Sequence, residues 1–144
     1  MPVSLERILD ARGATRVLLI GSDSPTLPRA ILAAAFAGLA CADATVVPAF
    51  DGGWVALGLT RPLGAVLRDV RWSSEATCTE TVEALRRSGR AVQVLPPWYD
   101  VDTLDDLRRL ADELEGQAGL TAPRTAALLR EPSLVSAALG RIAA

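Results

Sequence analysis

Hydrophobic residues along this chain fall into short runs with strand character and longer stretches with helical spacing. Four short runs predict β-strands at about residues 16–20, 44–50, 54–59 and 91–95. Stretches between and after them predict helices at about residues 28–40, from Ser73 or Ser74 to about Ser88, and from Thr103 through Leu114. Shorter helices are expected from Ser4 to Gly13, after Thr121-Ala-Pro123, and beyond Pro132-Ser133. This alternation of strands and helices predicts an α/β protein.

The first predicted strand leads into the loop that has the clearest chemical character. Residues 17–20 are all apolar, which is typical of a strand buried on both faces, and the loop 21–25 carries Asp23. Ligands of open α/β sheets bind beyond the carboxyl ends of the strands, where Asp23 would lie. The loop has one glycine, so we expect a phosphate here to be held through a metal ion. Alternatively, Asp23 and Ser24 cap the following helix or shape the turn.

Composition narrows the possible functions. The chain has 144 residues, 50% of them hydrophobic, and a formal net charge of -2, which fits one folded domain. Its 15 basic residues are all arginines and are scattered, which argues against a nucleic-acid partner. Histidine is absent, which excludes Ser-His-Asp triads and zinc sites with histidine ligands.

Cysteine usage and hydropathy predict a cytoplasmic protein without a membrane span. Cys41 and Cys78 lack the short spacing of a metal site and are expected to be free thiols. The most apolar run, residues 30–42, is too short to cross a bilayer.

A second group of acidic residues follows the fourth predicted strand. Asp100 and Asp102 come after this strand as Asp23 comes after the first, so all three can project from one sheet edge. Converging carboxylates suit Mg²⁺ or Mn²⁺ that also holds a nucleotide diphosphate. Alternatively, Asp102 helps to start the next helix, where Thr103 and Asp106 form a near capping box.

The segment Asp51-Gly52-Gly53-Trp54 lies between the second and third predicted strands. It is either the turn of a hairpin or a ligand-facing loop. Glycines let backbone N–H groups approach a substrate, and an indole can stack on a sugar or base. Alternatively, the glycines only make the turn, while Trp54 and Trp98 fill the core.

Four motifs together resemble those of a known bacterial family. They are Gly-Ser-Asp-Ser-Pro-Thr-Leu-Pro at 21–28, Asp-Gly-Gly-Trp at 51–54, Trp-Ser-Ser at 72–74, and Leu-Pro-Pro-Trp-Tyr-Asp-Val-Asp-Thr-Leu-Asp-Asp-Leu at 95–107. In order and spacing they resemble the glycosyltransferase-like family DUF2064, which belongs to the nucleotide-diphospho-sugar transferases. The resemblance implies a partial GT-A-like three-layer sandwich, with a small mixed sheet and flanking helices.

The resemblance also implies a site. It assigns Asp23 and Asp102 to a divalent ion, Mg²⁺ or Mn²⁺, and Asp51 to the catalytic role of orienting or deprotonating an acceptor. The implied partner is a nucleotide-sugar or a nucleotide. The substrate-binding residues it implies are Ser22, Ser24, Gly52, Gly53, Trp54, Trp72 and Ser73.

The resemblance covers about residues 5–115 and implies that part of the family's fold precedes Met1. Residues 1–118 would be the C-terminal portion of a GT-A-like domain, and residues 119–144 a helical extension. Two hypotheses follow: a metal-dependent glycosyltransferase or nucleotidyltransferase, and a non-catalytic α/β module for oligomerisation or partner binding. Because residues 17–20 would form an exposed edge strand, we also expect a homodimer.

Overall fold

A computed structural model describes residues 15–115 and 121–131. The described chain divides into two compact units. The first contains residues 15–21 and 27–99, and the second contains residues 22–26, 100–115 and 121–131. The helices expected from Ser4 and after Pro132-Ser133 lie outside the described residues. The expected domain boundary at residue 118 also lies outside them and stays a prediction.

The first unit is built on a mixed sheet of four strands in the order β1-β3-β2-β4. Strand β3 is antiparallel to both of its neighbours, whereas β4 is parallel to β2. The strands are β1 (Val17–Ile20), β2 (Ala44–Pro48), β3 (Trp54–Leu59) and β4 (Val92–Val94). This arrangement confirms the α/β class that the sequence pattern predicted and the small mixed sheet that the resemblance implied.

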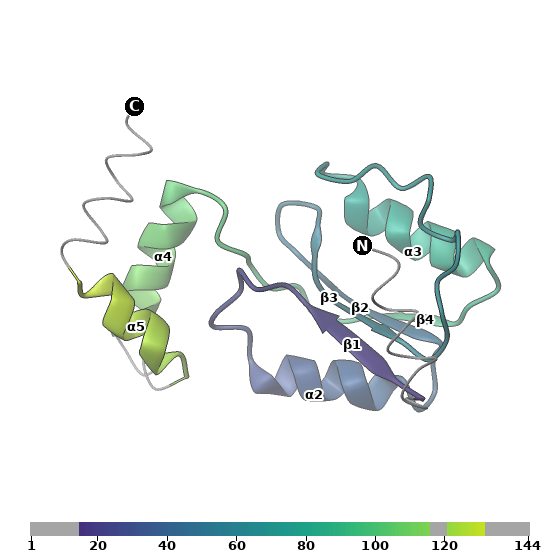
Figure 1. Ribbon diagram of the computed structural model, residues 1–144, viewed down its shortest axis with the longest axis horizontal. Helices are drawn as coiled ribbons and strands as arrows, with labels where there is room; N and C mark the ends of the chain where they lie inside the picture. Colours follow the sequence, from purple (N-terminus) through teal and green to yellow (C-terminus); the bar gives the residue numbers. More distant parts are fainter. Residues whose placement is uncertain (1–14, 116–120, 132–144) are drawn as a thin grey trace. The chain divides into compact units, whose positions relative to one another are not determined.

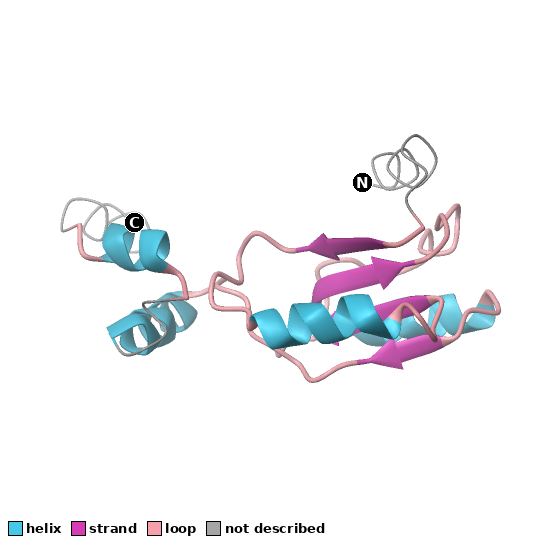
Figure 2. Cartoon of the chain, turned by 90° about the horizontal axis from the view of Figure 1, so that it is seen from below, coloured by secondary structure: helices cyan, strands magenta, loops and turns pink. Residues whose placement is uncertain are grey.

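Two helices cover the opposite faces of this sheet and give the first unit three layers. Helix α2 (Arg29–Gly38) packs on one face and α3 (Thr77–Arg87) on the other (Figure 1). Seen from below, α2 passes in front of the strands (Figure 2). The predicted helix at about residues 28–40 is therefore confirmed, and on its outer face Phe36 is 47% exposed.

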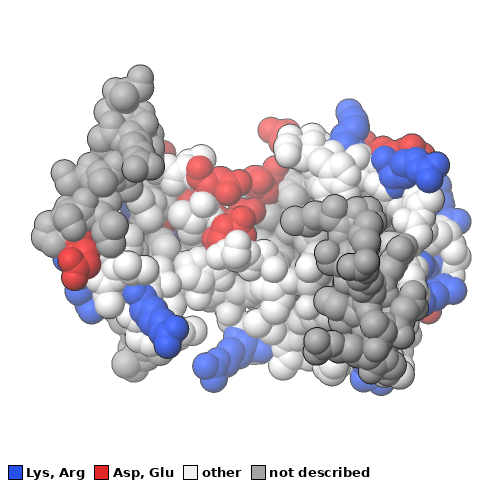
Figure 3. Space-filling model, viewed as in Figure 1, with Lys and Arg blue, Asp and Glu red and all other residues white. Residues whose placement is uncertain are grey.

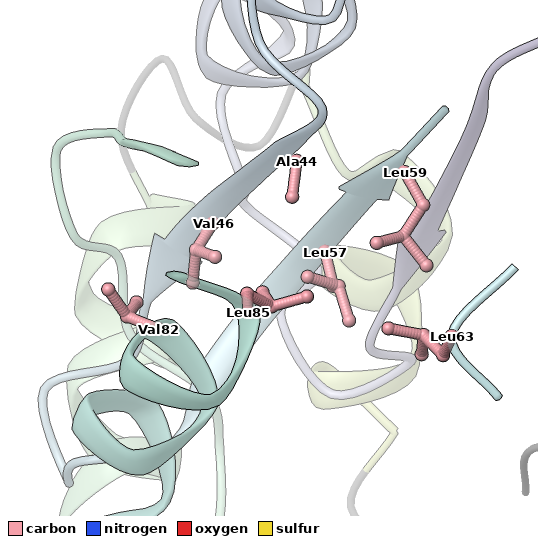
Figure 4. Packing of buried hydrophobic residues seen from close by; sticks show 7 residues of the cluster. All are labelled: Ala44, Val46, Leu57, Leu59, Leu63, Val82 and Leu85. Atoms are coloured by element: carbon pink, nitrogen blue, oxygen red, sulfur yellow. The ribbon is translucent and has the colours of Figure 1, made fainter. Parts of the chain in front are cut away.

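The core alternates between the two faces because successive strand residues point in opposite directions. The cluster against α3 consists of alternate residues of β2 and β3 with residues from α3 and the loop after β3 (Figure 4): Ala44, Val46, Leu57, Leu59, Leu63, Val82 and Leu85. The neighbouring positions, such as Val47 and Ala56, face α2, where they meet Ala35.

Strand β1 lies at one end of the described strand order, as the sequence predicted for an edge strand. The expectation that it is buried on both faces is wrong, because its first three residues are half-buried and Ile20 is 45% exposed. An edge strand has a neighbour on one side only, so less of its surface is covered.

In the second unit, α4 (Leu104–Glu115) packs on α5 (Pro123–Leu129). Leucines on one face of α4 supply this contact, since Leu110 and Leu114 are buried against Ala122 and Ala126. The helix predicted to begin near Pro123 is thereby confirmed.

Candidate functional site

The structure gathers the predicted site residues into two groups, one in each unit. In the second unit, the loop that carries Asp23 lies beside the segment before α4. The main-chain N–H of Val101 donates a hydrogen bond of 2.9 Å to the Asp23 carbonyl. The Thr26 hydroxyl donates to Glu113 in α4 at 3.3 Å. These two bonds hold the Asp23 loop on the chain that carries Asp100 and Asp102.

Asp100 and Asp102 bring their carboxylates together. An oxygen of one lies within 4.8 Å of an oxygen of the other, with Asp102 exposed and Asp100 half-buried. The Asp23 carboxylate does not lie within that distance of both of these carboxylates. Asp23 is linked to their segment through its main chain, by the hydrogen bond with Val101. The sequence placed Asp100 among the acids that can converge at one edge, but the resemblance assigned only Asp23 and Asp102 to the ion.

The residues present fit a hard divalent cation. Carboxylate and hydroxyl oxygens are the ligands that Mg²⁺ and Mn²⁺ prefer. Ser24, next to Asp23, is buried, and its hydroxyl has no hydrogen-bond partner among the described residues. A buried hydroxyl without a partner is costly, so an unpaired Ser24 next to the acidic loop is consistent with a polar ligand there.

Helix capping does not account for Asp23 or Ser24. Helix α2 has Pro28 as its N-cap residue, and among the described residues no side chain caps it. Turn shaping remains as the alternative for these two residues.

The capping box at the start of α4 is confirmed, and it leaves the Asp102 carboxylate outside. Asp106 accepts hydrogen bonds from the Thr103 N–H at 2.9 Å and its hydroxyl at 2.6 Å, while Thr103 accepts from the Asp106 N–H at 3.2 Å. The bond from the Thr103 hydroxyl is the main cause that lowers the pKa of Asp106. Asp102 contributes its main-chain N–H, at 3.4 Å from the Asp106 carboxylate. Its own carboxylate is therefore not used in the cap.

In the first unit, Asp51 and the two glycines form the turn of the β2–β3 hairpin. Asp51 accepts a hydrogen bond of 2.8 Å from the Gly53 N–H. Gly52 has φ +94°, and a Cβ there would lie 2.2 Å from the Glu75 carbonyl oxygen. The Gly52 carbonyl also accepts from the Cys78 N–H at 2.7 Å. The hairpin interpretation is thus confirmed, and only glycine fits at position 52.

Two tryptophans of the predicted site are in contact. The rings of Trp54 and Trp72 meet edge to face, with centroids 6.3 Å apart and an angle of 71° between their planes. Trp54 is half-buried against the core, and so is Trp98, as the alternative interpretation expected. Trp72 is 54% exposed.

The loop that carries Trp72 and Ser73 is held by residues that sequence reasoning did not assign. The hydroxyls of Ser74 and Thr77 both donate to the Arg71 carbonyl, at 3.0 and 2.8 Å. Glu80 accepts from the Arg71 N–H at 2.8 Å and from its Nε at 2.7 Å. The Arg71 side chain is the main cause that lowers the pKa of Glu80.

These bonds also correct the expected start of α3. The helix begins at Thr77 and not at Ser73 or Ser74, because the side chains of Ser74 and Thr77 form hydrogen bonds within the loop. The three-residue spacing of a serine and a threonine is a signal for such a local motif. The contact between Arg71 and Glu80 has no comparable signature.

Charge and hydropathy of the described residues agree with two sequence expectations. On the face drawn in Figure 3, arginines are spread out and do not form one basic patch. Within the part of the chain that the structure describes, no helix is long and apolar enough to cross a membrane.

Comparison with known proteins shows which family the chain belongs to. The profile of the bacterial family DUF2064, described as "Uncharacterized protein conserved in bacteria", matches residues 1–74. The chain belongs to this family. The solved structures include a protein from Desulfovibrio desulfuricans G20, provisionally described as a nucleotide-diphospho-sugar transferase, that is 35% identical with a TM-score of 0.80. The match covers 92% of this DUF2064 chain and 58% of that protein. A comparison with curated proteins gave no match.

These findings confirm the suspected family and the α/β fold. The DUF2064 chain has a fold like that of the Desulfovibrio protein, and it spans 58% of that protein's length. The metal ion, the nucleotide-sugar and the roles of individual site residues stay predictions.

Proposed function

We propose that this chain binds a nucleotide-sugar through Mg²⁺ or Mn²⁺, as part of a metal-dependent glycosyltransferase or nucleotidyltransferase. One observation carries the proposal: the hydrogen bond from Val101 to the Asp23 carbonyl joins the two acidic loops of the second unit. The fold shared with the Desulfovibrio protein supports the substrate class.

Asp23 and Asp102 would hold the ion, with Asp100 beside them. Mg²⁺ in nucleotide sites is bound by one or two carboxylates together with substrate phosphates, so this set of acids is sufficient. The ion, when bound, supplies the positive charge that phosphates need, because acidic loops without an ion would repel them. The hydroxyls of Ser22 and Ser24 would donate hydrogen bonds to phosphate oxygens.

In the first unit, Asp51 would orient or deprotonate the acceptor hydroxyl. One of its carboxylate oxygens is fixed by the Gly53 N–H, which leaves the other to accept a hydrogen bond. The glycines at 52 and 53 keep side chains away from this acid, so a substrate can approach the backbone.

Calorimetric titration of the chain with UDP-, GDP-, CDP- and TDP-sugars tests the proposal, with and without Mn²⁺. We expect at least one nucleotide-sugar to bind in the presence of Mn²⁺, and Asp23→Asn or Asp102→Asn to weaken this binding at least tenfold. Asp105→Asn is the matched control, because Asp105 is exposed and pairs with Arg108. If no nucleotide-sugar gives heat with the unaltered chain, the proposal is wrong.

A second candidate function is a non-catalytic module that associates with itself as a homodimer. The observation that favours it is the position of β1 at the edge of the described sheet, with Ile20 45% exposed. Edge strands with apolar residues tend to pair with another chain. Light scattering at micromolar concentration checks this, and a strictly monomeric species would count against it. A cytoplasmic location stays a prediction.

A further inference from the structure

Trp72 is an exposed aromatic residue in an ordered surface loop. Trp72 is 54% exposed, whereas the chain's other tryptophans, Trp54 and Trp98, are half-buried. A single exposed aromatic residue is ordinary on a protein surface, so the surroundings of Trp72 decide whether it suits a ligand.

Hydrogen bonds on both sides of Trp72 anchor the backbone of its loop. Its start is anchored by Glu80, which accepts two hydrogen bonds from Arg71, and its end by Thr77, which donates to the Arg71 carbonyl. Between these anchors, Ser73 has φ +55°. A side chain other than glycine in this region costs about 1–2 kcal/mol, and such strain is found mainly where function requires it. The backbone around Trp72 is thus anchored before any ligand binds, which lowers the entropic cost of binding.

The same surface includes the proposed catalytic acid. Trp72 contacts Trp54, which directly follows the turn of Asp51. The turn and the loop are both fastened to the start of α3, since the Gly52 carbonyl accepts from Cys78 and the Ser74 carbonyl accepts from Thr77. The indole and the Asp51 turn therefore belong to one rigid part of the first unit.

The charge of this surface indicates which ligand it suits. Asp51 and Glu75 are exposed acids, and the arginine of the loop, Arg71, is already paired with Glu80. A phosphate would be repelled here. A sugar ring offers C–H groups to the face of an indole and hydroxyl donors to carboxylates, so it matches both features.

We infer that Trp72 is a stacking platform for the neutral sugar ring of the acceptor, next to Asp51. This inference rests on the proposed function and names the acceptor class of that site. Ser73 and Glu80 act as positioning residues, because they fix the loop without contacting the sugar.

The test is an NMR titration of the full chain with the methyl α-pyranosides of glucose, galactose and mannose. We expect at least one of them to shift the indole N–H of Trp72 and the amides of Gly52 and Gly53. Trp72→Ala should weaken this binding at least tenfold, whereas Trp72→Phe should retain part of it. Phe36→Ala is the control, since Phe36 is also an exposed aromatic residue, at 47%, but lies on α2.

Three results would overturn the inference: no pyranoside shifts these signals, Trp72→Ala binds as well as the unaltered chain, or UDP alone shifts Trp72 more than any sugar. Calorimetry of the same samples with nucleotide-sugars and Mn²⁺ separates the two proposals. Nucleotide-sugar binding without an effect at Trp72 refutes the platform alone, whereas loss of both refutes the proposed function as well.

Discussion

The N–H of Val101 donates a 2.9 Å hydrogen bond to the carbonyl of Asp23, across 78 positions of sequence (101 minus 23). This bond joins the loop after the first strand to the loop before α4 within one compact unit. It gives a physical reason for treating Asp23, Asp100 and Asp102 as one candidate site.

Gly52→Ala should strongly destabilise the fold. Its φ of +94° is unfavourable for alanine, and the added Cβ would lie 2.2 Å from the Glu75 carbonyl oxygen. We expect a loss of about 3 kcal/mol or more in the free energy of unfolding, from strain and overpacking together. Denaturant unfolding measures this loss.

Gly89→Ala is the matched control for this substitution. Gly89 also has a positive φ, +77°, but no atom lies near the position of its missing Cβ. It should lose only about 1 kcal/mol. Equal losses for the two variants would show that contact with Glu75 is unimportant.

Thr103→Ala should destabilise α4 by about 1 kcal/mol, because it removes the hydroxyl of the capping box. Thr79→Ala, at an exposed position of α3, should change stability by less than about 0.5 kcal/mol. Thermal unfolding followed by circular dichroism compares the two. A Thr103→Ala chain as stable as the Thr79→Ala chain would contradict the capping role.

The same box predicts a pH dependence. Hydrogen bonds from Thr103 lower the pKa of Asp106 in the folded chain, so Asp106 contributes stability above its unfolded pKa of about 3.9. This contribution is lost as the pH falls below that value, through the folded pKa. Asp106→Asn should therefore remove part of the acid-induced loss of stability. An unchanged acid unfolding curve for Asp106→Asn would count against this assignment.

Glu80 should couple the loop of Trp72 to pH in the same direction. Because Arg71 lowers the pKa of Glu80, the bond from the Arg71 N–H persists below the usual glutamate value of about 4.3 and breaks at lower pH. The amide shift of Arg71, followed by NMR, should titrate with a midpoint below about 4.3, the ordinary pKa of glutamate. Glu80→Gln should abolish this titration, and Glu83→Gln, one turn away on the exposed side of α3, should preserve it. A titration that persists in Glu80→Gln would point to another acid.

The hydrophobic pattern was sufficient to predict the strands. Strands β1, β2 and β3 each contain consecutive apolar residues, and in β4 the apolar residues Val92 and Val94 lie on either side of Gln93. Local polar motifs were also readable: Thr103 and Asp106 were expected as a capping box and form one. Contacts between residues that are distant in the sequence could not be predicted. Neither the main-chain bond of Val101 with Asp23 nor the pairing of Arg71 with Glu80 depends on a sequence pattern, so only the folded chain reveals them.

The start of α3 shows why local rules also have limits. Serine is a residue type that is common at helix N-caps, but the hydroxyl of Ser74 donates to the Arg71 carbonyl and the helix begins three residues later. Competition between a loop contact and a cap is decided by tertiary structure.

Paramagnetic broadening by Mn²⁺ tests the central claim, a metal site in the acidic loops of the second unit, most directly. Amide signals of the full chain are recorded while Mn²⁺ is added together with the nucleotide-sugar that binds in calorimetry, or with UDP-glucose if none does. We predict that the amides of Asp23, Val101 and Asp102 broaden first, and that Asp102→Asn suppresses this effect while Asp105→Asn does not. Broadening that begins at Asp105 or at other exposed acids, or that persists in Asp102→Asn, would contradict the assignment.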